Sequence, residues 1–274
     1  MRKILIFLII IILSSCSKKD TINSITREEG SGTRGAFVDL FELKEDGMDK
    51  IDDSIEVTNS TISILTSVKS DKNAMGYISF GSLNDNVKSV KIDNIKPSIE
   101  NIKTGKYSII RNLNIVIKEK NELINDFIKY INSTQAKEII EKNGYVSIDN
   151  NKIYKSSDLK GEINIIGSSS VAPIMQKLAE DYMIYNEKII VKVGQSDSTS
   201  GINSVLDGTC DIGMSSRELK ETEIDKGLES VVVCKDGIII IINKEQKIDN
   251  LTKKEVYDIY TKKIESWDRL YENK

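Results

Sequence analysis

Three short clusters of serine, threonine and glycine are the residues of this sequence best suited to binding an anion. Each cluster stands where a loop or strand passes into a segment with helical spacing. The first turn of a helix leaves amide donors unpaired and carries partial positive charge, and nearby hydroxyls add further donors. One such cluster alone is also typical of a helix cap or a turn. The clusters are Gly167-Ser168-Ser169-Ser170, Ser196-Asp197-Ser198-Thr199-Ser200-Gly201 and Gly30-Ser31-Gly32-Thr33.

An arginine adds weight to the third cluster. Arg27 stands shortly before Gly30 and is followed by Glu28 and Glu29. A guanidinium group offers a rigid fork of donors that matches an oxyanion. The alternative role for Arg27 is a surface ion pair with one of the two glutamates. We therefore take Arg27 as a candidate anion ligand.

The composition excludes several kinds of catalytic site. The chain has 274 residues and no histidine, so a Ser/His/Asp triad, an HExxH zinc site and a histidine general base are all excluded. A phosphatase built on Ser31 or Ser169 remains an alternative, but it would need a metal or clustered carboxylates, and the sequence places none beside these serines. We predict no enzyme activity, no cofactor and no metal.

The overall charge limits the class of partner. The formal net charge is −3 at pH 7, which argues against nucleic acid. An acidic protein that binds an anion must use local donors rather than the field of the whole molecule. Cys210 and Cys234 could form a disulfide outside the cell, but their apolar neighbours favour two buried free thiols.

The first residues have the features of an export signal. Arg2 and Lys3 precede an apolar run from Ile4 to Leu13, and small residues lead to Cys16. The run is shorter than the roughly 20 residues that cross a bilayer. The segment Leu13-Ser14-Ser15-Cys16 resembles the bacterial lipobox, in which the cysteine carries the lipid. We expect a signal peptide at 1–15, a lipid on Cys16 and a polar tether at 16–23, which would hold the protein on the outer face of the cell membrane.

Strands and helices alternate along the rest of the chain, which predicts an α/β fold. Helical spacing appears around Phe37, from Leu123 to Ile131, from Ile174 to Tyr182 and from Val256 to Tyr260, the last after a capping box formed by Thr252 and Glu255. Residues 149–162 are polar and aperiodic, so we expect a surface connection there. Predicted strands lie at 75–80, 115–117, 163–166, 189–193, 231–233 and 238–242.

Several longer motifs resemble one protein family, the phosphate-binding proteins of high-affinity phosphate ABC importers. The resemblance covers nearly all of 24–148 and 161–274. It rests on Thr26-Arg27-Glu28-Glu29-Gly30-Ser31-Gly32-Thr33-Arg34, on Ala74-Met75-Gly76-Tyr77-Ile78-Ser79-Phe80-Gly81-Ser82-Leu83, on Gly105-Lys106-Tyr107, on Gly144-Tyr145-Val146, on Gly167-Ser168-Ser169-Ser170-Val171-Ala172-Pro173-Ile174 and on Asp207-Gly208-Thr209-Cys210-Asp211-Ile212-Gly213-Met214-Ser215-Ser216-Arg217-Glu218-Leu219.

The order of these motifs differs from the family order, because the family's second half comes first here. The chain is therefore identified as a circularly permuted member, with residues 148–162 joining the family's old termini. The resemblance implies a two-lobed periplasmic-binding-protein-like (type II) fold with a hinge. By analogy, lobe B is 21–105 with 246–274 and lobe A is 107–243, with hinges near 105–108 and 243–247. A monomer is expected.

The resemblance also implies the ligand contacts. The matching positions are Arg27, Ser31, Gly32, Thr33, Ser169, Ser170 and Ser198, with Glu29 holding the arginine. Ser216 stands where well-known members have an aspartate that accepts the proton of monohydrogen phosphate. This departure keeps the anion class but leaves the choice between phosphate and sulfate open.

The function implied is extracytoplasmic capture of inorganic phosphate and its delivery to the membrane subunits of an ABC importer. Two alternatives remain within the binding class. One is another tetrahedral oxyanion such as sulfate or molybdate. The other is a remnant that binds or senses phosphate without a transport role.

Overall fold

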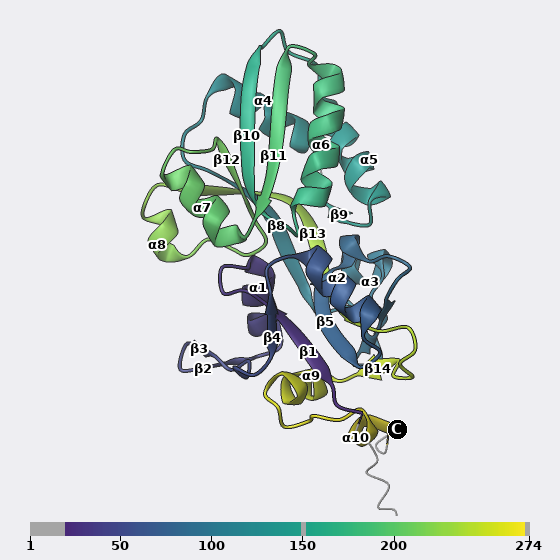
Figure 1. Ribbon diagram of the computed structural model, residues 1–274. Coiled ribbons are helices and arrows are strands. Elements are labelled where there is room, and N and C mark those ends of the chain that lie inside the picture. Colours follow the sequence, from purple (N-terminus) through teal and green to yellow (C-terminus); the bar gives the residue numbers. More distant parts are fainter. Residues whose placement is uncertain (1–19, 149–151, 272–274) are drawn as a thin grey trace, which may run out of the picture.

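The molecule has two lobes joined by long strands (Figure 1). The computed structural model describes residues 20–148 and 152–271. The predicted signal peptide, Cys16 and residues 17–19 of the expected tether therefore lie outside the described residues. The tether was predicted too long, because Ile22 is buried in the core and Asn23 begins the first strand. The architecture is mixed α/β with two lobes on one curled sheet, so the predicted fold class is confirmed.

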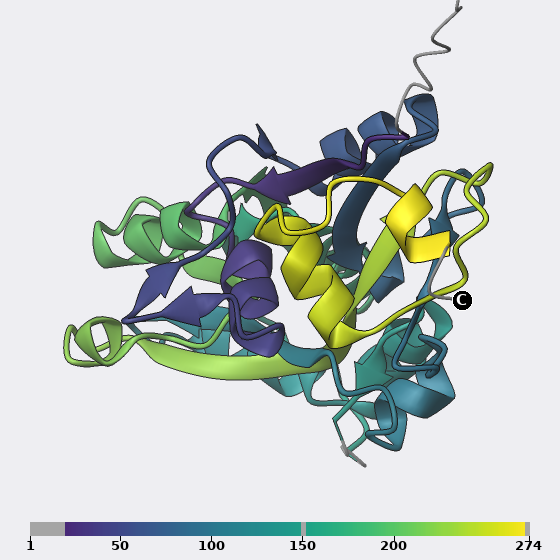
Figure 2. The same cartoon turned by 90° about the horizontal axis from the view of Figure 1, so that it is seen from below.

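The lower lobe of Figure 1 is built from the two ends of the chain. Its first part contains β1 (Asn23–Arg27), α1 (Gly32–Leu40), β2 (Lys44–Glu45), β3 (Met48–Asp49), β4 (Glu56–Thr58), α2 (Thr61–Ser70), β5 (Ala74–Ser79), the 3-10 helix η1 (Phe80–Ser82), β6 (Lys88–Ser89), β7 (Lys91–Ile92) and α3 (Ile99–Lys103). Its second part contains β14 (Asn250–Leu251), α9 (Lys253–Tyr260) and α10 (Asp268–Tyr271). The two parts pack together through α1 and α9, which lie side by side (Figure 2) with the rings of Phe37 and Tyr260 4.7 Å apart.

The upper lobe is built from the middle of the chain. It contains α4 (Glu122–Ile131), α5 (Thr134–Lys142), β9 (Val146–Ser147), β10 (Gly161–Ser168), α6 (Ala172–Tyr185), β11 (Ile189–Ser196), α7 (Ser198–Leu206), β12 (Ile212–Ser215) and α8 (Glu221–Ile224). Two further strands, β8 (Ile110–Ile117) and β13 (Glu229–Ile242), run through both lobes.

One sheet passes through the whole described molecule. Its order is β11-β10-β12-β8-β13-β5-β1-β4, with β6 and β9 also paired to β13. The outer strands of each lobe pair in parallel, as β10 does with β11 and β12, and β1 with β4 and β5. The central strands are antiparallel, since β13 pairs with both β8 and β5. The carboxyl ends of the parallel strands, such as Arg27 in β1 and Ser168 in β10, lie at the junction between the lobes (Figure 1).

Each lobe has its own apolar core, and β8 and β13 pass from one to the other. Ile109 packs in the lower core and Leu113 in the upper core, while Cys234 belongs to the upper core and Ile238 to the lower. The crossing points therefore lie inside the strands, inward of the expected hinges at 105–108 and 243–247. The reason is the apolar run Ile238–Ile242, which pairs with β5 and is fully buried in the lower lobe.

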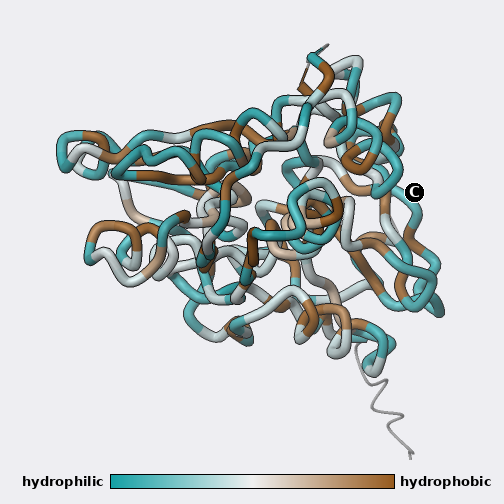
Figure 3. Tube along the Cα trace, turned by 90° about the horizontal axis from the view of Figure 1, so that it is seen from above, coloured by the Kyte–Doolittle hydropathy of each residue, from teal (hydrophilic) through white to brown (hydrophobic). Residues whose placement is uncertain are grey.

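The periodicity of the sequence accounts for most elements. Every predicted strand falls within or overlaps an observed one, but the runs at 231–233 and 238–242 form a single strand, β13, rather than two. The four predicted helices are observed as α1, α4, α6 and α9, and α9 has the predicted capping box from Thr252 and Glu255. Figure 3 shows the same pattern along the trace, where brown apolar stretches are broken by teal polar turns.

The two ends of the described chain meet on the lower lobe. Thr21 forms a β-bridge with Ser266, and the Trp267 amide donates to the Asp20 carbonyl at 2.9 Å. In a circularly permuted chain the new ends arise from a cut in a formerly continuous segment, so they are expected to lie together.

Of the connection predicted at 149–162, the structure describes residues 152–162, and this part is not entirely a surface loop. Tyr154 is 7% exposed and packs in the upper core. Its hydroxyl donates to Asp126 and accepts from the Asn186 side chain. Gly161 and Glu162 already belong to β10. The prediction of a purely surface connection was therefore wrong at Tyr154, because one aromatic ring in a polar segment was enough to anchor it.

Two further expectations concern thiols and the membrane. Cys210 and Cys234 are both free and buried, as predicted from their apolar neighbours. Across residues 20–148 and 152–271, no helix combines the length and hydropathy needed to cross a bilayer.

Candidate functional site

A group of buried hydroxyls lies where the two lobes meet. We call it the hydroxyl cluster. Every member is at most 5% exposed, and each lies in, or within two residues of, a strand end or a helix start. The lower lobe supplies two threonines and the upper lobe four serines. The members are Thr33, Thr61, Ser168, Ser170, Ser198 and Ser216.

The upper lobe places its serines at the ends of parallel strands. Ser168 is the last residue of β10, Ser198 is the first residue of α7 after β11, and Ser216 follows β12. Ser216 lies at the centre, because its Oγ is 3.0 Å from Ser168 Oγ and 3.3 Å from Ser198 Oγ. Its amide also donates to Ser198 Oγ at 3.0 Å. Strand order thus gathers residues that are 48 positions apart in the sequence.

The lower lobe faces these serines with the N-terminus of α1. Ser31 is the N-cap, and Gly32 and Thr33 begin the helix, as the sequence predicted for this junction. Thr33 Oγ1 lies 2.7 Å from Ser170 Oγ and 3.4 Å from Ser216 Oγ across the junction. A Cβ on Gly32 would overlap the side-chain oxygens of Ser198 and Ser216, so only glycine permits this approach. Amide donors and the positive end of α1 therefore face the hydroxyls.

Arg27 lies at the edge of the cluster and forms an ion pair with Glu28, whereas Glu29 was expected as its partner. Its guanidinium donates to both carboxylate oxygens of Glu28, at 2.8 and 2.7 Å, and it is 2% exposed. Its Nη1 is 3.5 Å from Thr61 Oγ1, which in turn is 3.4 Å from Ser170 Oγ. Glu29 is exposed, and the guanidinium of Arg27 has its hydrogen-bond partners in Glu28, Thr61 and Asn59 instead. The carboxylate that contacts Arg27 in the structure is therefore Glu28, its neighbour after β1, and not the expected Glu29.

A second arginine, missed by the sequence analysis, also reaches the cluster. Arg111 on β8 donates through Nη1 to Thr33 Oγ1 at 2.8 Å and to the Ser216 carbonyl at 3.4 Å. Its Nε and Nη2 donate to Asp236 Oδ2 on β13 at 3.2 and 3.1 Å. Asp236 also accepts from Ser79 Oγ and from the Phe80 amide. The pair thus connects the crossing strands, the lower lobe and the hydroxyl cluster.

Burial dominates the electrostatics of this second pair. It raises the pKa of Asp236, and the Arg111 charge and the Ser79 hydroxyl act against that rise. Burial likewise lowers the pKa of Arg111, opposed by Asp236. Both shifts mean that each ion depends on the other, because a lone charge would be poorly solvated at this position.

The predicted ligands do not all join the cluster. Thr33, Ser170, Ser198 and Ser216 meet there, and Gly32 lies against them. Ser31 is buried and accepts from the Arg34 amide as a cap. The Ser169 hydroxyl is buried but has no hydrogen-bond partner among the described residues, and it lines a separate cavity. Ser168 belongs to one of the predicted clusters but was not among the predicted contacts. Thr61, Arg111 and Asp236 were missed, although a charged residue beside an apolar strand run is an unusual pattern that marks a buried pair.

The chemistry of this arrangement is that of an anion receptor. Each hydroxyl can turn from its neighbour toward a bound oxygen atom, and a hydroxyl can also accept a proton from the ligand. Within the described ranges, no group of three or more carboxylate or cysteine side chains is placed to hold a metal.

Comparison with known proteins now identifies the family. The PBP superfamily domain matches residues 15–135 and 153–273. The phosphate-binding protein PstS 2 of Streptococcus agalactiae is 47% identical over 94% of this chain and 90% of its own length. The chain belongs to the PBP superfamily and, within it, to the PstS phosphate-binding protein family. The resemblance inferred from the motifs is therefore confirmed.

Two further relatives differ in how much of this chain they match. The crystal structure of a phosphate-binding protein of a phosphate ABC transporter from Streptococcus pneumoniae has a TM-score of 0.72 and 36% identity, covering 91% of this chain and 99% of that one. The PstS of Staphylococcus saprophyticus is 33% identical over 115 residues, which are 39% of this chain and 36% of the relative. The two streptococcal phosphate-binding proteins therefore match nearly end to end, whereas the staphylococcal one matches over less than half.

Proposed function

We propose that this protein captures inorganic phosphate between its lobes and delivers it to an ABC importer. The observation that carries the proposal is the hydroxyl cluster, in which both lobes contribute buried donors beside Arg27, Arg111 and the N-terminus of α1. Its relatives over nearly the whole chain are phosphate-binding PstS proteins. We assign the protein no catalytic role, because a hydroxyl receptor without an adjacent base binds and releases its ligand unchanged.

The position of the donors explains how capture would close the molecule. Gly32 and Thr33 lie on α1 in the lower lobe, while Ser170, Ser198 and Ser216 lie in the upper lobe. An anion that accepts from both sets binds the closed state better than the open state, so binding favours closure. The importer would then distinguish the closed, phosphate-loaded form from the open form by its shape.

Calorimetry with purified residues 17–274 tests the proposal. We expect one phosphate to bind per chain, and an aryl phosphate to be left unhydrolysed. Absence of phosphate binding under native conditions would overturn the function. Turnover of the aryl phosphate would instead support the phosphatase alternative built on Ser31 or Ser169.

Sulfate is the second candidate ligand, and a specific observation favours its binding. Ser216 is fully buried at the centre of the cluster, and no described carboxylate oxygen hydrogen-bonds to any cluster hydroxyl. Glu28 is held by Arg27, and Asp236 is held by Arg111. A site without a facing carboxylate does not repel an anion that has no proton to give.

Our first prediction is therefore that phosphate binds more tightly but that sulfate competes at about millimolar concentration. Replacing the central hydroxyl in Ser216→Asp should sharpen the preference for phosphate, because the carboxylate repels sulfate and accepts the phosphate proton. Calorimetry of parent and variant against both anions measures this. If the parent ignores sulfate and the variant gains no selectivity, another group accepts the phosphate proton.

We also propose that the mature protein is lipid-anchored at Cys16 on the extracytoplasmic face of the membrane, as a monomer. Support comes from the leader sequence and its resemblance to a lipobox. Labelling cells with a fatty-acid analogue should mark the protein, and Cys16→Ala should release it from the membrane fraction. A labelled Cys16→Ala protein would contradict this site of attachment.

Finally, we propose that the chain is circularly permuted, with lobe B at 21–105 and 246–274 and lobe A at 107–243, except that Ile109 and Ile238–Ile242 pack in the lower core and so belong with lobe B. Contacts between residues 20–22 and 265–267, and the short match to the staphylococcal PstS, support the permutation. A protease site inserted after Asn150 tests it. Cleavage should leave two fragments that stay together and bind phosphate. Separation of the fragments under native conditions would contradict the proposed joining of the old termini.

A further inference from the structure

The loop after β1 in the lower lobe touches the first turn of α7 in the upper lobe. The Gly30 carbonyl accepts two hydrogen bonds from Thr199, one from its amide and one from its hydroxyl, both at 3.2 Å. The two residues are 169 positions apart in the sequence. Both stand in the predicted clusters, but neither was a predicted phosphate contact. We call this pair of hydrogen bonds the Gly30–Thr199 latch, because it joins the lobes directly.

The place of Thr199 in α7 explains why its amide bonds across the junction. Asp197 is the N-cap of the helix, and its carboxylate accepts from the Ser200 amide and hydroxyl. Thr199 is the second residue of the helix, so its amide has no acceptor within α7. The positive end of the helix also favours a carbonyl oxygen at this place. The lower lobe therefore supplies the acceptor that α7 itself lacks.

The Thr199 hydroxyl is oriented by a charged group of its own lobe. Arg217 Nη2 lies 3.5 Å from Thr199 Oγ1. The guanidinium is fixed by both carboxylate oxygens of Glu223, each at 2.8 Å, and by the Glu218 carbonyl at 2.9 Å. A hydroxyl that accepts from a guanidinium turns its own proton away from it. The Gly30 carbonyl is the acceptor on that side.

The two surfaces fit so closely that position 30 has no room for a side chain. A Cβ on Gly30 would lie 2.4 Å from Asp197 Oδ1 and 2.8 Å from Asp197 Cγ. The carboxylate cannot turn aside without losing its hydrogen bonds to Ser200. A substitution at Gly30 therefore pushes the lower lobe away from α7.

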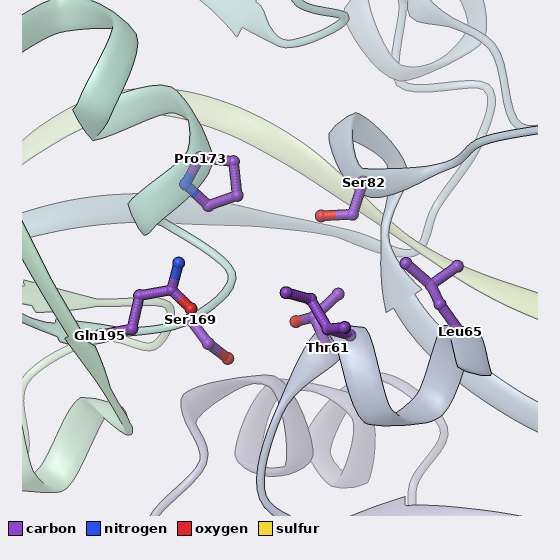
Figure 4. Close-up of a pocket in the computed structure, with 7 residues that line it drawn as sticks. Thr61, Leu65, Ser82, Ser169, Pro173 and Gln195 are labelled. Atoms are coloured by element: carbon purple, nitrogen blue, oxygen red, sulfur yellow. The ribbon is translucent and has the colours of Figure 1, made fainter. Parts of the chain in front are cut away.

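The junction is looser beside α2. There the lower lobe faces Ser169, Pro173 and Gln195 of the upper lobe across a cavity of about 200 Å³ (Figure 4). The hydroxyls of Ser169 and Ser82, which line this cavity, make no hydrogen bond with any described residue. The lobes are thus hydrogen-bonded to each other at the start of α7, whereas a gap remains between them here.

We propose that Thr199 is a positioning residue that holds the lobes closed over bound phosphate without contacting it. The inference rests on the proposed function, because closure matters only if the ligand is taken up between the lobes. Opening the lobes breaks both hydrogen bonds to Gly30, so the latch stabilises the closed form and slows the release of phosphate. Association begins from the open form and does not depend on the latch.

The dissociation rate of phosphate tests the role of the hydroxyl. Phosphorus exchange NMR measures this rate with purified residues 17–274, and calorimetry gives the dissociation constant. Thr199→Val should release phosphate about fivefold faster at an unchanged association rate, and Thr199→Ser, which keeps the hydroxyl, should retain the parent rate. Thr209→Val is the control, because the Thr209 hydroxyl bonds the Ser204 carbonyl within one lobe. An unchanged rate in Thr199→Val would overturn the latch alone, whereas a parent protein that binds no phosphate would overturn the proposed function.

A double-mutant cycle separates the latch from a direct contact with phosphate. Gly30→Ala acts from the other lobe and should raise the dissociation rate about tenfold, since it disrupts both hydrogen bonds. Adding Thr199→Val to Gly30→Ala should then change little, because the latch is already broken. If the two effects multiply instead, Thr199 acts independently of Gly30 and the proposal is wrong.

Hydrogen exchange at single amides gives a second readout, which a purely structural role of Thr199 would not change. The Thr199 amide should exchange slowly in the phosphate-loaded protein and fast in the free protein. The Thr209 amide, which donates to the Ser204 carbonyl at 2.9 Å within the upper lobe, should be equally protected in both. Equal exchange of the Thr199 amide with and without phosphate would contradict the latch.

Discussion

Two arginine–carboxylate pairs flank the hydroxyl cluster, and they differ in almost every respect. Arg27 and Glu28 are neighbours in the sequence, and the Glu28 side chain is 24% exposed. Arg111 and Asp236 are 125 positions apart, and their side chains are 4% and 0% exposed. The first pair is a local arrangement at the end of one strand, whereas the second exists only when the fold is complete.

This difference assigns the pairs different roles. Arg27 can exchange part of its contact with Glu28 for a ligand, because Glu28 keeps access to water. Arg111 is held by Asp236 and contacts both Thr33 and the Ser216 carbonyl, so it fixes the hydroxyls of both lobes relative to the crossing strands. We expect Arg27 to act mainly on affinity and the Arg111–Asp236 pair mainly on stability.

The largest effect should come from breaking the buried pair. Asp236→Ala leaves the Arg111 charge without its counter-ion and removes the acceptor of Ser79 Oγ and the Phe80 amide. Loss of one partner of a buried ion pair costs about 3–5 kcal/mol of stability. Urea denaturation should show this loss, and Asp236→Asn, which keeps an acceptor, should lose less.

Glu28→Ala is the matched control for this comparison. Its partner Arg27 retains a hydrogen-bond distance to the Asn59 carbonyl, and the pair borders solvent. Because the Arg27 guanidinium is itself buried, the loss should exceed that of a surface pair, but it should stay below that of Asp236→Ala, since Arg27 keeps other acceptors and Glu28 reaches solvent. Equal losses in Asp236→Ala and Glu28→Ala would show that burial does not separate the two pairs.

The second effect concerns affinity. Arg27→Ala should weaken phosphate binding at least about tenfold, because a charged hydrogen bond contributes about 1.5–3 kcal/mol. The melting temperature of the free protein should change little, since Glu28 can be hydrated. Calorimetry and thermal denaturation measure the two quantities. Arg269→Ala, exposed on α10, controls for loss of a positive charge and should retain the parent affinity.

The same comparison shows what could be predicted from the sequence. Elements with a clear period, such as α6 and β10, were predicted because their apolar faces repeat within a few residues. The N-terminus of α1 was predicted because Ser31 and Gly32 signal a helix start locally. The continuity of β13 was missed, because Lys235 and Asp236 interrupt its apolar run and only the pairing with Arg111 explains a buried charge there.

Parts of the site could not be predicted from the sequence for the same reason. Thr61 starts α2 far from the other motifs in the chain, and only the β1-β4 pairing brings it near Arg27. The family resemblance suggested Glu29, but the backbone at the end of β1 turns Glu28 rather than Glu29 toward the guanidinium. Contacts set by strand order or by the direction of one side chain require the folded structure.

A third pair, Arg217 with Glu223, tests the comparison at intermediate burial, with side chains 14% and 12% exposed. Burial alone would raise the pKa of Glu223, but hydrogen bonds from Arg217 and the Lys220 amide outweigh it, so the pKa lies below the model-peptide value of 4.5. Because the folded protein favours the ionised form, the stability from Glu223 is present above the unfolded-state pKa and is lost as the pH falls through the folded-state pKa.

Glu223→Gln should therefore cost about 1 kcal/mol or less at pH 7, and the difference from the parent should shrink toward zero in acid. Urea denaturation across this range measures it. In an Arg217→Met background most of the dependence should disappear, and its persistence there would assign the shift to the Lys220 amide instead.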